Sequence, residues 1–357
     1  MRYRTQPLVA CLVVGLAACG RSDKRLPAGP AASSSQPSPG GRAALTGAGA
    51  TFPNPIYTKW FDAYAKQTGV RINYQSIGSG GGIRQFTEGT VDFGATDGPM
   101  TDEQIGAAKG NVVHLPTVIG AVVLTYNLPR LGGSRLKLDG PTIAAIYSGE
   151  ITNWNDSRIG ALNPGMKLPN TDLIVVHRAD GSGTTYVFTD YLSKVAPRWA
   201  SAVGKSTAVK WPIGLGGKGN EGVTQQVKQT EGAIGYVELL YATSNNLAYA
   251  DVKNAAGAYA TPSIRTVSAA AAGIPLNEDT DFRVSITNPD GAESYPIASL
   301  TWLLVRKAPA DPAKHRLLKG FLEWMLTPEA QRMAADLGYA PLPVKLIEIE
   351  QRRIAAL

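Results

Sequence analysis

Apolar residues recur along this chain with the spacing of strands in some stretches and of helices in others. Val70, Ile72 and Tyr74 alternate with polar residues, which predicts a half-buried strand. Ile56 and Trp60, with apolar neighbours after them, fall on one face of a predicted helix. The same reasoning predicts strands at 91–95, 173–176 and 296–305, and helices at 142–147, 187–192, 312–326 and 327–338. Glycine-rich turns join several of these units.

In two longer stretches the apolar residues do not show the spacing of a single strand or a single helix. An apolar run at 112–126 is broken by Pro116 and Gly120, so we expect two strands, or one bent strand, passing between lobes rather than a membrane helix. The segment 254–278 is rich in Ala, Pro and Gly. We expect it to decorate the surface.

The turn at 177–186 joins a predicted buried strand to a predicted helix and has the composition of an anion site. Gly181 and Gly183 let the backbone approach a ligand closely, and the amides of a first helical turn lack internal partners. Hydroxyls flank Gly183, and Arg178 supplies a fork of N–H groups that suits two oxygens of one oxyanion. The turn therefore predicts oxyanion binding, although a merely capped turn uses the same residue types.

Two earlier turns also precede predicted helices. Thr51 lies just before a helix in which Asn54 is the expected N-cap and Pro55 the first helical residue. The glycine loop at 77–82 carries the hydroxyl of Ser79. Both turns would aim free amides and a hydroxyl at one point, although Thr51 has the alternative role of a second capping residue.

Asp97 is the unexpected residue among these turns, because a carboxylate at a strand end should repel an anion. It would be tolerated if the ligand brought a proton to share with it, as hydrogen phosphate does and sulfate at neutral pH does not. The alternative is a turn or helix cap, although Thr101 and Gln104 already form a predicted capping box downstream.

The N-terminal residues follow the order of features found in the signal peptide of a bacterial lipoprotein. Arg2 and Arg4 precede an apolar run at 8–16, and small residues then lead to Cys19. This resembles a lipobox, so residues 1–18 are predicted to be removed and Cys19 to carry the lipid anchor in the periplasm. An ordinary secretory signal that contains a cysteine is the alternative. Residues 19–43, mostly Ser, Pro, Gly and Ala, are predicted to be a flexible tether.

Composition narrows the function classes further. The chain has 357 residues, of which 44% are hydrophobic and 18% are charged. This length and this apolar content are enough to fill the cores of two compact domains. Loss of Arg2 and Arg4 with the signal leaves 33 Lys+Arg against 28 Asp+Glu, so the formal charge falls from +7 to +5. This balance suits an anionic ligand, and no aromatic-laced basic patch suggests nucleic acid. The three histidines lack metal-ligand spacing and the glycine loops lack nucleotide-binding spacing, so no metal or cofactor is expected.

Six segments, taken in order, resemble the phosphate-binding proteins of bacterial high-affinity phosphate ABC importers: 45–53, 77–79, 91–95, 178–184, 211–222 and 232–238. The resemblance implies an α/β fold, the two-lobed periplasmic binding protein of type II, with a mixed sheet flanked by helices in each lobe and the ligand in the interlobe cleft. It implies a lobe 1 of residues 44–122 plus 296–357 and a lobe 2 of residues 123–295. The chain would then be a monomer that captures inorganic phosphate and delivers it to the permease subunits of an ABC importer.

The same resemblance assigns the phosphate contacts position by position to Thr51, Phe52 (through its backbone N–H), Ser79, Asp97, Arg178, Ser182, Gly183 and Thr184. Asp180 would orient Arg178 without contacting the phosphate itself. Gly80 departs from the family pattern, because many relatives carry a second serine there, and only its amide remains as a donor. Closure of two lobes would replace the hydration of the anion with fixed dipoles.

Other function classes remain open from the sequence. Ser182, His177 and either Asp97 or Asp180 nominally supply a catalytic triad, so a phosphatase-like hydrolase is one alternative. Against it, His177 and Arg178 should point to opposite faces of one strand, and no G-x-S-x-G elbow is present. Two further alternatives remain. One is a binding protein for another oxyanion such as sulfate, and the other is a lipoprotein that serves in adhesion or as a scaffold. We expect no enzymatic activity.

Overall fold

The computed structural model describes residues 44–109, 111–133, 135–275 and 278–357. The predicted signal peptide, Cys19 and the tether lie outside the described residues. Within the described ranges, the helices are all too short or too polar to cross a membrane.

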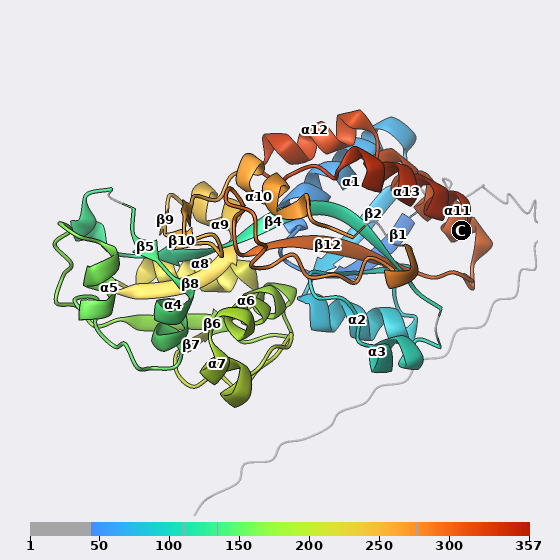
Figure 1. The fold of residues 1–357 in the computed structure, drawn as a ribbon. Helices are drawn as coiled ribbons and strands as arrows, with labels where there is room; N and C mark the ends of the chain where they lie inside the picture. Colours follow the sequence, from blue (N-terminus) through green and yellow to red (C-terminus); the bar gives the residue numbers. More distant parts are fainter. Residues whose placement is uncertain (1–43, 110, 134, 276–277) are drawn as a thin grey trace, which may run out of the picture. The chain divides into compact units, whose positions relative to one another are not determined.

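The backbone alternates short strands and helices, as the apolar spacing predicts (Figure 1). The strands are β1 (Ala44–Gly49), β2 (Arg71–Ser76), β3 (Phe93–Thr96), β4 (Val113–Tyr126), β5 (Lys137–Leu138), β6 (Ile174–Arg178), β7 (Leu215–Gly217), β8 (Ala233–Glu238), β9 (Ala248–Tyr249), β10 (Asp251–Lys253), β11 (Tyr259–Ala260) and β12 (Ala298–Val305). The helices are α1 (Asn54–Thr68), α2 (Ser79–Glu88), α3 (Asp102–Ala107), α4 (Gly140–Tyr147), α5 (Ser157–Leu162), α6 (Gly183–Val195), α7 (Pro197–Ala202), α8 (Gly219–Gln229), α9 (Leu239–Ser244), α10 (Ile264–Ala271), α11 (Pro312–Met325), α12 (Pro328–Asp336) and α13 (Val344–Ala355).

Nine strands form one mixed sheet in the order β2-β1-β3-β12-β4-β8-β6-β7, with β9 paired to β4. The β1, β2 and β3 pairings are parallel, as are those among β6, β7 and β8, whereas β12 and β4 run antiparallel to their neighbours. Parallel strands need helical crossovers, and α1, α2 and α8 supply them. A second sheet of three strands has the order β11-β10-β5.

The long strand β4 links the two parallel groups. Its first part, through Ala121, pairs with β12, and its last part, from Val122 onward, pairs with β8. The sequence predicted either two strands or one bent strand here. The structure has one continuous strand, and all 14 of its residues are buried. The ladder shifts register opposite Pro116, which has no N–H to donate. At Gly120 a Cβ would lie 2.5 Å from the ring of Phe52, so glycine makes room for that ring.

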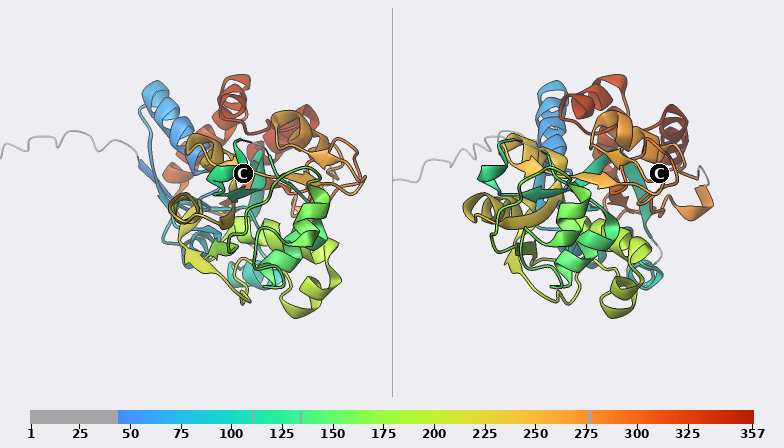
Figure 2. Two further views of the ribbon diagram at one scale, coloured as in Figure 1. Left: turned by 90° about the vertical axis from the view of Figure 1, so that its left-hand side faces the viewer. Right: turned by 60° about the vertical axis from the view of Figure 1, so that its left-hand side comes forward.

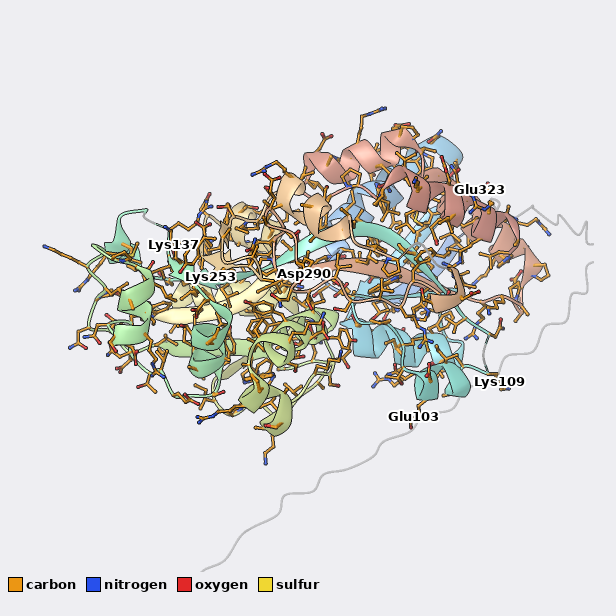
Figure 3. All side chains as sticks on the ribbon, viewed as in Figure 1. Glu103, Lys109, Lys137, Lys253, Asp290 and Glu323 are labelled. Atoms are coloured by element: carbon orange, nitrogen blue, oxygen red, sulfur yellow. The ribbon has the colours of Figure 1, made fainter. Side chains whose placement is uncertain are left out.

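Helices from both ends of the chain meet on the same side of the sheet. In both views of Figure 2, α1 in blue lies beside the red C-terminal helices, and α1 contacts both α11 and α12. The indole N–H of Trp60 on α1 donates to the carbonyl of Ala330 on α12 at 2.8 Å. Charged side chains such as Glu103 and Glu323 point outward from the ribbon (Figure 3).

Two local predictions need correction. The residue before α1 is Pro53, which makes no side-chain cap, so Asn54 is inside the helix and is not its N-cap. Much of segment 254–278 is not surface decoration: α10 buries Val267 and Ala270 against β4 and β12, because its apolar residues fall on one face. The sequence patterns also gave no prediction for several helices, including α5, α7, α9, α10 and α13.

Candidate functional site

The predicted site residues come from turns that are far apart in sequence and meet at the strand ends. Ser79 begins α2 and Gly183 begins α6, yet the Gly183 N–H donates to Ser79 Oγ at 3.0 Å. The Gly80 N–H donates to the carbonyl of Gly181 at 2.9 Å. A Cβ at Gly183 would lie 2.5 Å from Ser79 Oγ, so this approach requires glycine. Thr51, Asp97, Arg178, Ser182 and Thr184 are all buried around this contact.

Asp97 presents one oxygen that has no partner in the described part of the chain. Its Oδ1 accepts a hydrogen bond from Thr301 Oγ1 at 2.8 Å, whereas its buried Oδ2 accepts none. Burial raises the pKa of Asp97 to about 7, and the Thr301 hydrogen bond and the Arg178 charge oppose that rise. Oδ2 is therefore a buried acceptor suited to a ligand that carries a proton.

Asp180 holds the Arg178 side chain. The guanidinium donates from Nε to Asp180 Oδ1 at 2.8 Å and from Nη2 to Oδ2. Asp180 also accepts the Gly219 N–H at 3.0 Å. Burial of the Asp180 carboxyl opposes its ionisation, but these donors together hold its pKa below the usual range. The Nη1 end of Arg178 points instead to Thr184 Oγ1 at 3.4 Å, so one end of the fork remains directed at the site.

The Ser79 hydroxyl is restricted to a donor role. It accepts two hydrogen bonds, from the Gly183 N–H at 3.0 Å and from the Asp97 N–H at 3.2 Å. A hydroxyl has two acceptor lone pairs and one proton. Both lone pairs are in use, so the proton is what Ser79 can offer to a ligand.

Thr51 and Thr184 are restricted in the same way by a residue absent from the predicted set, Asn220 at the start of α8. Thr51 Oγ1 accepts the backbone N–H of Asn220 at 3.2 Å and its Nδ2 at 2.7 Å. Thr184 Oγ1 accepts Asn220 Nδ2 at 3.2 Å and Arg178 Nη1 at 3.4 Å. The two threonine protons, like that of Ser79, have no protein acceptor among the described residues. Three hydroxyls that offer protons and one carboxylate oxygen that needs one therefore lie together.

Other predicted residues have roles that the sequence did not define. Ser182 is the N-cap of α6, and its Oγ accepts the Thr185 N–H at 3.0 Å. The Phe52 ring packs on Tyr339, with centroids 6.3 Å apart, so its side chain is part of the core. The Gly80 amide donates to Gly181 and thus joins the start of α2 to the turn before α6, whereas the sequence suggested a free donor.

The geometry does not assemble the nominal triad. The His177 ring stacks on Trp211 at 4.9 Å, and its Nδ1 lies 3.0 Å from the carbonyl of Arg178. The Arg178 guanidinium instead contacts Asp180 and Thr184, so His177 and Arg178 have different side-chain partners. Across the described ranges, no group of His, Cys, Asp and Glu is arranged to hold a metal ion.

Asn220 and Thr301 were missed for different reasons. Asn220 lies in the glycine-rich segment 214–222, where a polar residue beside glycines was the only signal. Thr301 is a polar residue inside the apolar strand predicted at 296–305, and its partner Asp97 is about two hundred residues away. A buried hydroxyl in an otherwise apolar strand is the signal that points to it.

Comparisons with known proteins show which family the chain resembles in sequence and in fold. A family model described as the PBP superfamily domain matches residues 34–329. The chain is 44% identical over 303 residues to the phosphate-binding protein PstS of Haemophilus influenzae, covering 85% of this chain and 90% of that protein. It is 36% identical over 322 residues to PstS of Methanocaldococcus jannaschii, covering 84% and 83%. Its fold is similar to a high affinity periplasmic phosphate-binding protein (PfluDING) solved with phosphate, with TM-score 0.71 and 20% identity over 87% of this chain and 93% of that one.

Proposed function

The chain belongs to the PBP superfamily, as a relative of the PstS phosphate-binding proteins, and we propose that it captures hydrogen phosphate and delivers it to an ABC importer. The mixed α/β, two-lobed fold is that of solved phosphate-binding proteins. The proposal extends to the ligand contacts: Thr51, the Phe52 N–H, Ser79, Asp97, Arg178, Ser182, Gly183 and Thr184, with Asp180 orienting Arg178.

One observation carries the choice of ligand. Donors converge on the site from Thr51, Ser79, Thr184 and Arg178, while Asp97 Oδ2 is a buried acceptor without a protein partner in the described chain. Hydrogen phosphate offers several acceptor oxygens and one proton, which matches this pattern. Sulfate would set its lone pairs against those of Asp97, and a site built for one hydrogen bond rejects a ligand that lacks it by about four to five orders of magnitude.

The direct test is calorimetric titration of the protein after bound anion has been stripped. We expect saturable binding of phosphate with one site per chain and no measurable heat with sulfate at the same concentrations. Equal binding of both anions would contradict the role of Asp97. Absence of binding by either would contradict the proposed function and favour the adhesion alternative.

We also propose lobe boundaries close to the pairing change in β4: residues 44–122 plus 296–357 as lobe 1 and 123–295 as lobe 2. The exchange of partners at Val122 supports this division, since β12 lies on one side and β8 on the other. Hinge closure about β4 would bring Ser79 and Gly183 together. Small-angle scattering with and without phosphate is expected to show contraction on binding.

The chain is proposed to act in the periplasm as a lipid-anchored monomer without catalytic activity. The order of charge, apolar run and small residues before Cys19 supports the anchor. Metabolic labelling with a palmitate analogue is expected to mark the wild-type chain and not Cys19→Ser. Release of p-nitrophenol from its phosphate ester, above blank and lost in Ser182→Ala, would support the hydrolase instead.

A further inference from the structure

Three tyrosine hydroxyls bind three successive carbonyl groups in the turn between β1 and α1. The donors and acceptors, with their distances, are Tyr74 to Ala50 (2.7 Å), Tyr241 to Thr51 (2.6 Å) and Tyr339 to Phe52 (2.8 Å). The tyrosines come from β2, from α9 and from the segment after α12, so elements far apart in the sequence converge on one turn. Burial raises the pKa of Tyr241 and of Tyr339 above the usual tyrosine value, so each hydroxyl keeps the proton that it donates.

The Tyr241 contact determines where the next backbone N–H points. The peptide bond between Thr51 and Phe52 is trans, and in a trans peptide the C=O and the following N–H point in opposite directions. Holding the Thr51 carbonyl on Tyr241 therefore turns the Phe52 N–H away from α9. Phe52 has no exposed surface, and its N–H donates to no acceptor in the described part of the chain. A buried N–H without an acceptor is rare in folded proteins, which points to a ligand as its acceptor.

Tyr241 differs from the other two tyrosines in its place relative to the proposed lobe division. The other two fall in lobe 1, as the turn does, whereas Tyr241 falls in lobe 2. The Thr51 carbonyl also accepts the N–H of Asn54 within the turn, at the longer distance of 3.2 Å. Separation of the lobes would leave this carbonyl with the longer of its two hydrogen bonds, and the Phe52 N–H would no longer be held in one direction.

We propose that Tyr241 is a positioning residue that directs the Phe52 N–H at the bound anion, and that it does so only when the lobes are closed. This inference rests on the proposed function, in which the Phe52 N–H is a phosphate contact. It adds a residue that acts through the backbone without touching the anion. Lobe closure would then align a donor as well as enclose the ligand.

The peptide bond in question can be observed by itself in solution by NMR. The dipeptide Thr-Phe occurs once in the chain, at residues 51–52, so labelling with ¹³C at threonine carbonyls and ¹⁵N at phenylalanine amides isolates one signal. In the wild type we expect the Phe52 amide proton to move downfield when phosphate is added, because its N–H gains a charged acceptor. In Tyr241→Phe this movement at saturating phosphate should be less than about half as large, and calorimetry should show about 5- to 50-fold weaker phosphate binding.

Tyr339→Phe is the matched control. It removes the same kind of hydroxyl from the next carbonyl of the turn, but residue 53 is proline and has no N–H for that carbonyl to orient. Tyr339 Oη also lies 3.2 Å from Glu238 Oε2, so the variant is expected to lower the melting temperature. The Phe52 amide signal should nevertheless move as far as in the wild type at saturating phosphate.

Glu221 supplies a second variant if Tyr241→Phe does not fold. Its Oε1 lies 3.0 Å from the Tyr241 hydroxyl and competes with the Thr51 carbonyl for that single proton, and its side chain is exposed. Glu221→Ala should move the Thr51 carbonyl signal downfield, because the Tyr241 proton is then donated to that carbonyl alone. An unchanged carbonyl signal would overturn the inference.

The remaining outcomes separate this inference from the proposed function. The inference is overturned if Tyr241→Phe keeps the full wild-type movement of the Phe52 signal, or if Tyr339→Phe loses as much of it as Tyr241→Phe. A wild type that binds phosphate without any movement of that signal would overturn the inference and leave phosphate capture standing. Failure of the wild type to bind phosphate in calorimetry would overturn both.

Discussion

Asp97→Asn is the substitution that most directly tests how the anion is recognised. Thr301 Oγ1 donates to Asp97 Oδ1 at 2.8 Å, and its alternative acceptor, the carbonyl of Thr96, is more distant at 3.3 Å. The amide oxygen of the variant is therefore expected at the position of Oδ1. Its NH2 group would replace Oδ2 and convert the one acceptor facing the ligand into a donor.

The size of the effect follows from the hydrogen bonds exchanged. Phosphate would lose a hydrogen bond to a charged group, worth about 1.5–3 kcal/mol, which corresponds to about 10- to 150-fold in affinity. Sulfate would lose the repulsion between its lone pairs and the buried carboxylate and would gain a donor. A preference of about four to five orders of magnitude should consequently shrink to less than about a hundredfold.

Titration calorimetry with each anion measures both changes in one variant. Asp190→Asn is a suitable control, because Asp190 is equally buried but binds Lys205, Ser285 and Thr287 away from the site. The control should keep the wild-type preference even if its melting temperature falls. If Asp97→Asn still excluded sulfate as strongly as the wild type, discrimination would not depend on a shared ligand proton, and the argument from Asp97 would be refuted.

Three further results are expected. In Gly183→Ala the new Cβ would lie 2.5 Å from Ser79 Oγ and 2.6 Å from the backbone N of Asp97, so calorimetry should show at least about 100-fold weaker phosphate binding, and the melting temperature should fall. Thr301→Val removes the donor to Asp97 Oδ1 and should weaken phosphate binding about tenfold, with a further rise in the pKa of Asp97 detectable by carboxyl NMR. Burial raises the pKa of Asp97 to about 7 and that of Glu238 to about 8, so the folded chain holds more protons than the unfolded chain between about pH 4 and pH 8. The melting temperature of the phosphate-free protein should therefore fall as pH rises through that window. The double variant Asp97→Asn, Glu238→Gln should show a smaller fall. A wild-type melting temperature that does not change with pH would show that these two carboxyls do not control the pH dependence of stability.

The sequence was informative where one segment carries a complete local pattern. The turn from Arg178 to Thr184 contains its strand end, its glycines and its helix start within a few residues, so its role could be proposed from spacing alone. The roles of Asn220 and Thr301 depend on contacts between distant segments. Thr301 reaches Asp97 only because β12 runs antiparallel beside β3, with Trp302 opposite Thr96. Apolar periodicity predicts that β12 is a strand but gives no information about which strand lies beside it.

The donor directions in this site arise from contacts between separate segments rather than from any one of them. Ser79 becomes an obligatory donor through the Gly183 N–H, and Thr51 through Asn220, so neither hydroxyl would be restricted if these segments moved apart. Under the proposed lobe division, each of these contacts crosses from one lobe to the other. Closure would then create the specificity as well as exclude water, and a ligand with the wrong proton count would weaken the contacts that keep the lobes closed. Discrimination should accordingly be expressed mainly as faster release of the wrong anion, because the open form offers hydroxyls that can still rotate.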